Sequence, residues 1–395
     1  MTGGRGGHGH QDPGPRIESP AGIRQILVVK LAGIGDLLTA FPALEALRGR
    51  WPEAEITALV TPQTESLLQG AGLVDRVMVL DKYLFDDAGG FLRPRRLAAL
   101  LRLAADLRSR SFDVAILLHH LVTWAGVAKY ALLMMATGAR WRVGLNDGRG
   151  RFLNLSARDG GFGALHEVDY WLVAVRLLGA TTDEPRVRGD WGREEEEFAR
   201  QVWSRLRLDS TDSVVAVHPG SGSYSTVRRW YPERYAAVAS ALAADGLIPL
   251  VVAGPGEEEL ARMVAAGAGG GGRELEGVPS ARKLAAVLAG CRLFVGNDGG
   301  VMHLAFAAGV PVVAVFGPSN HRAWGPYDPG GERSRIVRVD LPCSPCFYRG
   351  QSLGLRYGCG DLQCLLRIVP EGVIAAAREL LAATAPAQSA RRPRA

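Results

Sequence analysis

Short apolar runs and longer amphipathic stretches alternate along the chain in two series. Apolar runs bounded by turn residues are typical of buried parallel strands, and apolar residues three or four apart are typical of helices. The first series predicts strands at 26–30, 55–60, 76–80 and 113–118, with helices at 38–50, 63–70, 95–109, 121–136 and 167–178. The second predicts strands at 213–218, 248–253, 292–296, 311–316 and 335–339, with helices at 232–244, 257–266, 281–289 and 300–308. This alternation predicts an α/β protein with doubly wound parallel sheets.

The length of 395 residues and the polar segments around the two series predict two domains. Residues 1–22 are rich in Gly, Pro and His without periodicity, so we expect them to be disordered. We expect the first domain over 23–180, a linker over 181–212 and the second domain over 213–370. A C-terminal helix and a disordered basic tail are expected over 371–395.

The most informative turn follows the apolar run that ends at Val295. It contains Asp298, Gly299 and Gly300 and opens a predicted helix that carries His303. Free N–H groups and the positive end of the helix dipole attract anions at such a turn, and glycines let a phosphate approach the backbone. We therefore expect a site for the diphosphate of a nucleotide. An ordinary strand–turn–helix with a capping aspartate is the alternative interpretation.

Two further turns of the second domain offer polar groups at the carboxyl ends of predicted strands. The strand 213–218 leads into a small-residue turn around Ser221, which suits a phosphate or a ribose, and Arg228 follows shortly after. A guanidinium can clamp a diphosphate through two hydrogen bonds, although a solvated basic pair would look the same. After the strand at 248–253, Glu257 or Glu258 could accept hydrogen bonds from a ribose, or simply favour a helix start.

The first strand also ends in a glycine-containing loop that opens a helix. Lys30 closes the strand, and Gly33, Gly35 and Asp36 follow. The spacing lacks the third glycine of a dinucleotide-binding fingerprint. Asp36 nevertheless places a carboxylate at the carboxyl end of the first strand, where open α/β sheets bind their ligands. A helix N-cap is the alternative role for this residue.

Together these motifs resemble glycosyltransferase family 9, whose best-known members are the bacterial ADP-heptose:lipopolysaccharide heptosyltransferases. The resemblance covers roughly residues 24–380. Its motifs are 30–36 with Pro42, 142–144, 166–179, 218–221 with 228–230, and 297–303 running on to 309–311 and 316–318. It implies a GT-B architecture, with two Rossmann-like domains facing a cleft. It also implies an acceptor on the first domain, a nucleotide sugar on the second, inversion of the anomeric centre and no catalytic metal.

The resemblance also assigns roles to particular residues. Asp36 matches the general base, and Gly299, Gly300 and His303 match the diphosphate turn. Arg228 stands where the family commonly has lysine, Gly299 where it usually has Thr or Ser, and Glu257 matches the glutamate near the ribose. Lys30, Gly35 and Arg142 fall in motifs of the acceptor domain and are assigned to acceptor binding. The expected reaction moves a heptose from an ADP-linked donor to an anionic glycolipid such as the lipopolysaccharide inner core. A GT-B-shaped enzyme of the epimerase type and a non-catalytic nucleotide-sugar-binding module are the alternatives.

Charge and hydropathy narrow the possible partners. The formal net charge is +6, but residues 88–151 alone hold eleven basic and three acidic side chains, a local net charge of +8. This excess attracts acidic sugars or an anionic membrane surface, unless it is only a solvated face. No nucleic-acid motif accompanies it, so we expect no nucleic-acid partner.

The apolar stretch 121–136 contains Lys129 and is too short to span a bilayer, so it predicts a buried helix. We expect a cytoplasmic protein with at most peripheral contact to the cytoplasmic face of the inner membrane.

Four cysteines lie close together in a loop-rich segment, 343–364. Cys343, Cys346, Cys359 and Cys364 have the spacing C-x2-C-x12-C-x4-C. In a cytoplasmic protein this pattern favours a structural zinc site, although the four-residue gap in the second pair weakens it. Reduced thiols without a metal and disulfides are the alternatives. None of the cysteines has a partnered base that would indicate a nucleophile.

Overall fold

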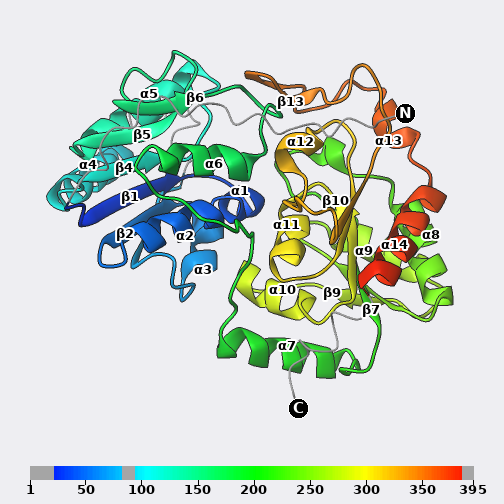
Figure 1. The fold of residues 1–395 in the computed structure, drawn as a ribbon. Coiled ribbons are helices and arrows are strands. Elements are labelled where there is room, and N and C mark those ends of the chain that lie inside the picture. Colours follow the sequence, from blue (N-terminus) through cyan, green and yellow to red (C-terminus); the bar gives the residue numbers. More distant parts are fainter. Residues whose placement is uncertain (1–21, 82–93, 385–395) are drawn as a thin grey trace, which may run out of the picture.

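The computed structural model describes residues 22–81 and 94–384. These residues form two α/β domains side by side, each built on a six-stranded parallel sheet (Figure 1). Most of segment 1–22 and the end of the tail, 385–395, were predicted to be disordered and lie outside the described residues. The predicted α/β class with two doubly wound sheets is confirmed.

The first domain has the strand order β3-β2-β1-β4-β5-β6. Its strands are β1 (Gln25–Lys30), β2 (Glu55–Val60), β3 (Arg76–Val79), β4 (Val114–Leu117), β5 (Trp141–Asn146) and β6 (Leu155–Arg158). Its helices are α1 (Ile34–Leu38), α2 (Phe41–Arg50), the 3-10 turn η1 (Pro62–Thr64), α3 (Glu65–Leu68), α4 (Pro94–Ser109), α5 (Trp124–Ala136) and α6 (Glu167–Arg176). The strand order reverses between β1 and β4, and ligands bind at such a switch point.

The second domain repeats this topology with the order β12-β11-β10-β7-β8-β9. Its strands are β7 (Val214–His218), β8 (Ile248–Val252), β9 (Arg273–Leu275), β10 (Leu293–Asn297), β11 (Val312–Val315) and β12 (Ser334–Val337). Its helices are α8 (Pro232–Ala244), α9 (Glu258–Gly267), α10 (Ala281–Leu288), α11 (Gly300–Ala307), α12 (His321–Trp324), α13 (Gln363–Leu366) and α14 (Pro370–Thr384). The switch point lies between β7 and β10, so the turns that follow these two strands are neighbours.

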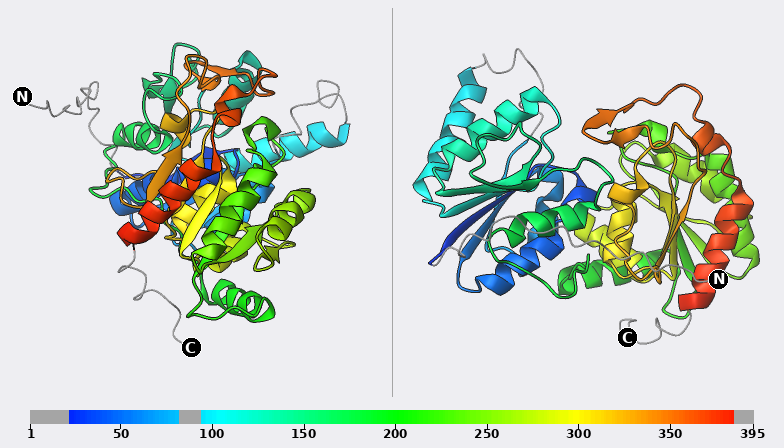
Figure 2. Two further views of the ribbon diagram at one scale, coloured as in Figure 1. Left: turned by 90° about the vertical axis from the view of Figure 1, so that its right-hand side faces the viewer. Right: turned by 45° about the horizontal axis from the view of Figure 1, so that its top comes forward.

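Helix α7 (Arg193–Arg205) falls within the predicted linker and packs on α10 of the second domain. Figure 2 shows α14 on the side of the second domain that faces away from the first. One apolar core cluster continues from the first domain through α1 and α11 into the second, and includes Leu37, Leu38 and Met302. The two domains therefore share packing at the place where α1 meets α11.

All nine predicted strands are present, and the elements that were missed have physical explanations. Strand β5 has Arg142, Gly144 and Asn146 among its six residues, and β6 and β9 are short edge strands, so none of them forms a clear apolar run. The helix predicted at 38–50 corresponds to α2, which begins at Phe41, and the residues before it form a separate short helix, α1. Pro42 in the first turn of α2 separates the two, because proline cannot continue a preceding helix.

The prediction of a buried helix at 121–136 is wrong in one respect. Helix α5 buries Val127, Tyr130, Leu133 and Met134, but Trp124 and Leu132 are 73% and 74% exposed. The helix packs on the domain with one face only, and its uniformly apolar sequence concealed the second, exposed face. Among the helices of residues 22–81 and 94–384, none combines the length and apolar character needed to cross a membrane.

Candidate active site

The glycine-containing turns of the two domains lie directly against each other. A Cβ atom at Gly35 would be 2.4 Å from Cδ2 of His303, and a Cβ atom at Gly300 would be 3.1 Å from Cβ of Ile34. The start of α1 thus packs on the first turn of α11, and the glycines permit this approach. The structure brings together the residues that the sequence assigned separately to a base and to an anion-binding turn.

Asp36 lies in the first turn of α1, at the boundary between the domains. Its carboxylate is half-buried and accepts a hydrogen bond from the N–H of Gly33 at 3.3 Å. The side chain therefore helps to cap its own helix, and Gly33 rather than Asp36 occupies the N-cap position. The predicted carboxylate is in place at the carboxyl end of β1.

Lys30, at the end of β1, is buried beneath this carboxylate. Its ammonium lies 3.9 Å from the centroid of the Trp171 ring. Burial lowers the pKa of Lys30, while the charges of Asp36 and Glu167 act in the opposite direction. Lys30 was predicted to bind the acceptor, but it is 2% exposed and sits among these groups instead of projecting from the surface.

Arg142 is placed differently from the other predicted acceptor residues. In the sheet, Arg142 of β5 pairs with Ala115 of β4, and Ala115 pairs with Leu27 of β1. Arg142 therefore lies at the level of Leu27, three residues before Lys30, where β1 ends. Its guanidinium donates hydrogen bonds to the carbonyls of Phe152 (2.8 Å) and Ala139 (3.0 Å). The structure does not bring Arg142 to the edge that carries Asp36.

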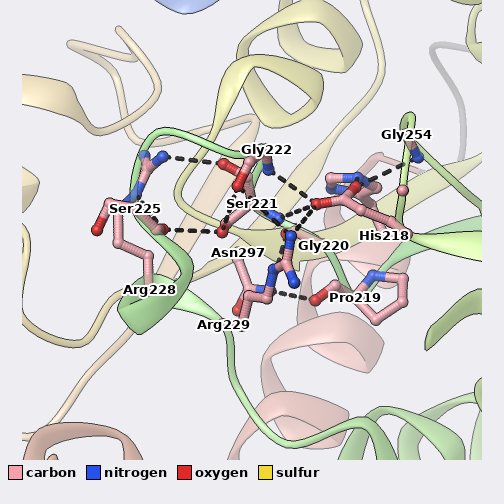
Figure 3. A network of polar contacts seen from close by, with 12 residues as sticks. His218, Pro219, Gly220, Ser221, Gly222, Ser225, Arg228, Arg229, Gly254 and Asn297 are labelled. Atoms are coloured by element: carbon pink, nitrogen blue, oxygen red, sulfur yellow. Dashed lines mark hydrogen bonds and ion pairs between the residues drawn. The ribbon is translucent and has the colours of Figure 1, made fainter. Parts of the chain in front are cut away.

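A buried carboxylate organises the turn after β7, shown in Figure 3. Oε1 of Glu257 accepts hydrogen bonds from the N–H groups of Ser221 and Gly222, both at 2.9 Å, and from Arg229 at 2.8 Å. Oε2 accepts the N–H of Gly254 at 3.2 Å and lies 3.0 Å from Nε2 of His218.

Burial alone would raise the pKa of Glu257, but His218 and the backbone N–H groups lower it to about 2. The carboxylate is therefore ionised at neutral pH. A ribose contact at Glu257 would have to compete with these five donors, whereas the neighbouring Glu258 is exposed.

Arg228 joins the turn after β7 to the turn after β10, and we call these two the phosphate turns of the second domain. Its guanidinium donates to the carbonyl of Ser221 at 2.9 Å (Figure 3). It also lies 3.3 Å from Oδ2 of Asp298. Asp298 is thus paired with an arginine, and Gly299 occupies the N-cap of α11, so the interpretation of Asp298 as a simple capping residue does not hold. The predicted residues Ser221, Arg228, Asp298 and Gly299 form one cluster.

His303, one turn into α11, is buried. Burial lowers its pKa to about 4, and the charges of His166 and Arg228 act in the same direction, against Asp298. Its imidazole is neutral at neutral pH, so its contribution to an anion site is a hydrogen bond and not a positive charge.

Two buried groups near the site were missed as organising residues. Asn297 accepts hydrogen bonds from the Trp230 N–H and the Tyr235 hydroxyl, and donates to the carbonyls of Pro219 and Gly220, which fixes both phosphate turns. The only sequence signal for it was its place in the turn motif.

The second group is a histidine between two carboxylates. His120 lies 2.8 Å from Asp159 and 3.0 Å from Glu167. Burial opposes its protonation, but these carboxylates raise its pKa to about 9. The three residues are far apart in the sequence, and Glu167 was noticed only as part of the motif 166–179.

The cysteine segment contains free thiols only. Burial raises the pKa of Cys346, and it raises that of Cys364 to about 11. The charges of neighbouring cysteine thiolates add to both shifts, so these side chains lie near the other cysteines. In the part of the chain that the structure describes, no group of three or more His, Cys, Asp or Glu residues is arranged to hold a metal ion. The four cysteines of segment 343–364 therefore form neither disulfides nor a preformed zinc site in this structure.

Comparison with known sequences gives a consistent assignment. The profile of "Glycosyltransferase family 9 (heptosyltransferase)" matches residues 100–356. The chain is 24% identical over 373 residues to the lipopolysaccharide heptosyltransferase 3 of Escherichia coli K12, covering 89% of this chain and 96% of that protein. It is 28% identical over 187 residues to a lipooligosaccharide heptosyltransferase 2 of Campylobacter jejuni, a match that spans 47% of this chain and 56% of that relative.

Solved structures give the same architecture. The family 9 glycosyltransferase of Veillonella parvula superposes with a TM-score of 0.71 at 24% identity, covering 91% of this chain and 97% of that one. The E. coli heptosyltransferase WaaC with ADP-2-deoxy-2-fluoro heptose has a TM-score of 0.62 at 21% identity, covering 80% and 93%. The fold is GT-B, with two parallel-sheet α/β domains.

Proposed function

The chain belongs to glycosyltransferase family 9, and from this premise we propose that it transfers a heptose from ADP-heptose to an anionic glycolipid such as the lipopolysaccharide inner core. We propose further that the transfer inverts the anomeric centre and that Asp36 is the general base. The observation that carries this proposal is the packing of the Asp36 turn on the anion-binding turn of α11.

The proposed reaction assigns a role to each side of the domain boundary. Asp36 takes the proton of an acceptor hydroxyl as its oxygen forms a bond to the anomeric carbon. The bond between that carbon and the phosphate oxygen breaks, and ADP leaves with the electron pair. Arg228 and the free N–H groups of α11 stabilise the charge that develops on the diphosphate. No metal ion takes part in these steps.

The donor is tested by binding, and the base by transfer. ADP, UDP and GDP are compared by thermal shift, and transfer is followed with ADP-heptose and a lipopolysaccharide-precursor acceptor. We expect ADP to bind the wild type and Asp36→Asn about equally, while transfer by Asp36→Asn falls by about 10²–10⁴-fold. His303→Ala is expected to weaken ADP binding.

Each contrary result has a distinct meaning. Binding of ADP without transfer by the wild type would favour a nucleotide-sugar-binding module. Full transfer by Asp36→Asn would exclude this carboxylate as the base. Absence of binding to all three nucleotides would overturn the donor site.

We also propose that the first domain docks on an anionic membrane surface through α4 and α5. The two helices contact each other, and together they expose Leu97 and Leu101 on α4 and Trp124, Leu132 and Met135 on α5. The surrounding segment has the basic excess noted above, which suits anionic lipid headgroups. The acceptor of the proposed reaction is itself a glycolipid, so this contact would keep the enzyme and its acceptor at the same membrane surface.

A final proposal concerns the cysteine segment, for which we propose a structural metal ion such as zinc. Four thiols are a donor set that suits zinc or iron. Backbone N–H groups of Leu362 and Asp361 lower the pKa of the Cys359 thiol, which favours the thiolate that a metal binds. The four side chains would have to draw together. Metal analysis of the purified protein should find about one equivalent, lost in Cys343→Ser/Cys346→Ser; a metal-free wild type would overturn this.

A further inference from the structure

The cysteine segment carries a hairpin that is attached to the loop after β7, residues 219–229, which we call the donor loop. Its strands are β13 (Phe347–Arg349) and β14 (Ser352–Gly354). Arg356, just after the hairpin, donates to the carbonyl of Tyr224 at 2.9 Å, and its own carbonyl accepts the Ser225 hydroxyl at 2.9 Å. Arg228 in turn donates to the carbonyl of Ser225 at 3.3 Å. Two hydrogen bonds through Ser225 thus link the residue that follows the hairpin to the arginine of the proposed donor site.

The same hairpin also contacts the first domain. The N–H of Phe162 donates to the carbonyl of Gly350 at 2.9 Å, and the Gln351 side chain donates to the carbonyl of Asp159 at 2.8 Å. Asn320 donates from one amide nitrogen to the carbonyls of Phe162 (3.1 Å) and Tyr348 (2.9 Å). The hairpin therefore bridges the two domains beside the site, and Asn320 ties the carbonyl of Tyr348, in the middle of β13, to that of Phe162 in the first domain.

Tyr348 has an unusual backbone and a tightly held ring. Its φ of +58° lies in the left-handed region, which non-glycine residues adopt mainly where the surroundings enforce it, often at functional sites. The ring stacks on Phe347 with a centroid separation of 3.9 Å and lies 5.0 Å from the ring of Phe162 and 5.5 Å from that of Trp324. Among the described residues, its hydroxyl has no hydrogen-bond partner.

The charges that act on Tyr348 come from both sides of the proposed site. Burial raises the pKa of Tyr348 well above 10, the charges of Asp36 and Asp298 raise it further, and that of Arg228 acts in the opposite direction. These three charges belong to the proposed base and the proposed diphosphate cluster, which agrees with the hydrogen bonds that tie the hairpin segment to Ser225 and Arg228. It stays protonated at neutral pH and can only donate its proton in a hydrogen bond to an anion.

We propose that Tyr348 is a donor-binding residue, whose hydroxyl donates a hydrogen bond to the β-phosphate of the nucleotide sugar on the side facing Asp36. This inference rests on the proposed function. The β-phosphate gains negative charge as the bond to the anomeric carbon breaks, so the hydrogen bond strengthens during transfer. The left-handed backbone and the bridging hairpin hold the hydroxyl there before the donor arrives.

Tyr348→Phe keeps the ring and its packing and removes only the hydroxyl. The matched control is Tyr357→Phe in the same segment, because Tyr357 is 79% exposed. Affinities for ADP and AMP are measured by calorimetry, and kcat and KM with ADP-heptose. We expect Tyr348→Phe to bind ADP about tenfold more weakly and AMP unchanged, since AMP lacks the β-phosphate, and to lose more in kcat than in KM. Tyr357→Phe should match the wild type in every measurement.

The contrary outcomes separate this inference from the proposed function. Equal ADP affinity in Tyr348→Phe and the wild type would overturn the phosphate contact. If kcat were reduced at the same time, the hydroxyl would contact the sugar and not the β-phosphate. Equal weakening for ADP and AMP would show a general disturbance of the pocket and overturn it as well. Failure of the wild type to bind ADP at all would overturn the proposed function, and with it the inference.

Discussion

His303 of the second domain packs directly on Gly35 of the first, with room for a hydrogen atom and nothing larger between them. An added Cβ atom would lie 2.4 Å from Cδ2 of the imidazole, closer than side chains approach each other. His303 is buried, so it cannot simply swing into solvent. The distance between the proposed base and the proposed diphosphate turn therefore depends on the absence of a side chain at position 35.

Gly35→Ala should separate the two turns without removing any functional group. We expect transfer to fall at least tenfold while ADP affinity changes little, because the diphosphate cluster belongs to the second domain. Overpacking of this kind costs about 1–3 kcal/mol of stability. The control is Gly49→Ala, where an added Cβ meets no atom within 4 Å and the helix tolerates alanine well. Steady-state kinetics and denaturant unfolding test this, and unaltered transfer by Gly35→Ala would contradict it.

Glu257→Gln should loosen the donor loop. The change places an amide N–H₂ group against N–H donors and removes the charge that they stabilise, so we expect ADP affinity to fall about tenfold or more. The pKa of Glu257 is lowered to about 2, so the carboxylate contributes stability above about pH 4.5 that is lost as the pH falls toward 2. A shift of this size corresponds to the order of 3 kcal/mol.

Acid unfolding and calorimetry with ADP test this role of Glu257. Glu258→Gln is the control, because Glu258 is exposed and lies next in the chain. The Glu257 variant should lack the wild type's loss of stability between pH 4.5 and 2. Weakened ADP binding in Glu258→Gln with none in Glu257→Gln would reverse the assignment of the two residues.

Much of the fold could be predicted because buried parallel strands are continuous apolar runs. A strand interrupted by polar residues, such as β5, escaped because the sheet buries only part of it. The site could be predicted only as separate turns. The backbone atoms of Gly35 and Gly300 decide whether those turns meet, and this is a property of domain packing that no local pattern contains. Tyr348 was missed because its position depends on a bridge between distant segments and on a backbone conformation that propensity disfavours.

The pair of carboxylates around His120 predicts a loss of stability at alkaline pH. The folded-state pKa is raised from 6.5 to about 9, so the contribution of His120 is fully present below pH 6.5 and is lost as the pH rises through 9. His120→Gln should remove this dependence and leave Asp159 and Glu167 facing each other, so it should be less stable than the wild type at pH 6.5. Urea unfolding at pH 6.5 and 9.5 tests this; the same alkaline loss in both proteins would contradict it.

The exposed apolar face of α4 and α5 predicts binding to anionic vesicles that depends on both apolar and charged groups. Trp124 and Leu132 lie on the outer face of α5, and each can insert into the interfacial region of a bilayer. We expect Trp124→Ser/Leu132→Ser to bind vesicles containing anionic lipid about tenfold more weakly than the wild type, which itself should bind neutral vesicles poorly. Added salt should weaken vesicle binding by the wild type, because salt screens the attraction between the basic residues of this domain and the anionic lipid.

Met263→Ser is the control, since Met263 is an exposed apolar residue on α9 of the second domain. Vesicle co-sedimentation gives the affinities. Equal binding by the double variant and the wild type would place the membrane contact elsewhere, and equal binding to neutral and anionic vesicles would remove the basic residues from it.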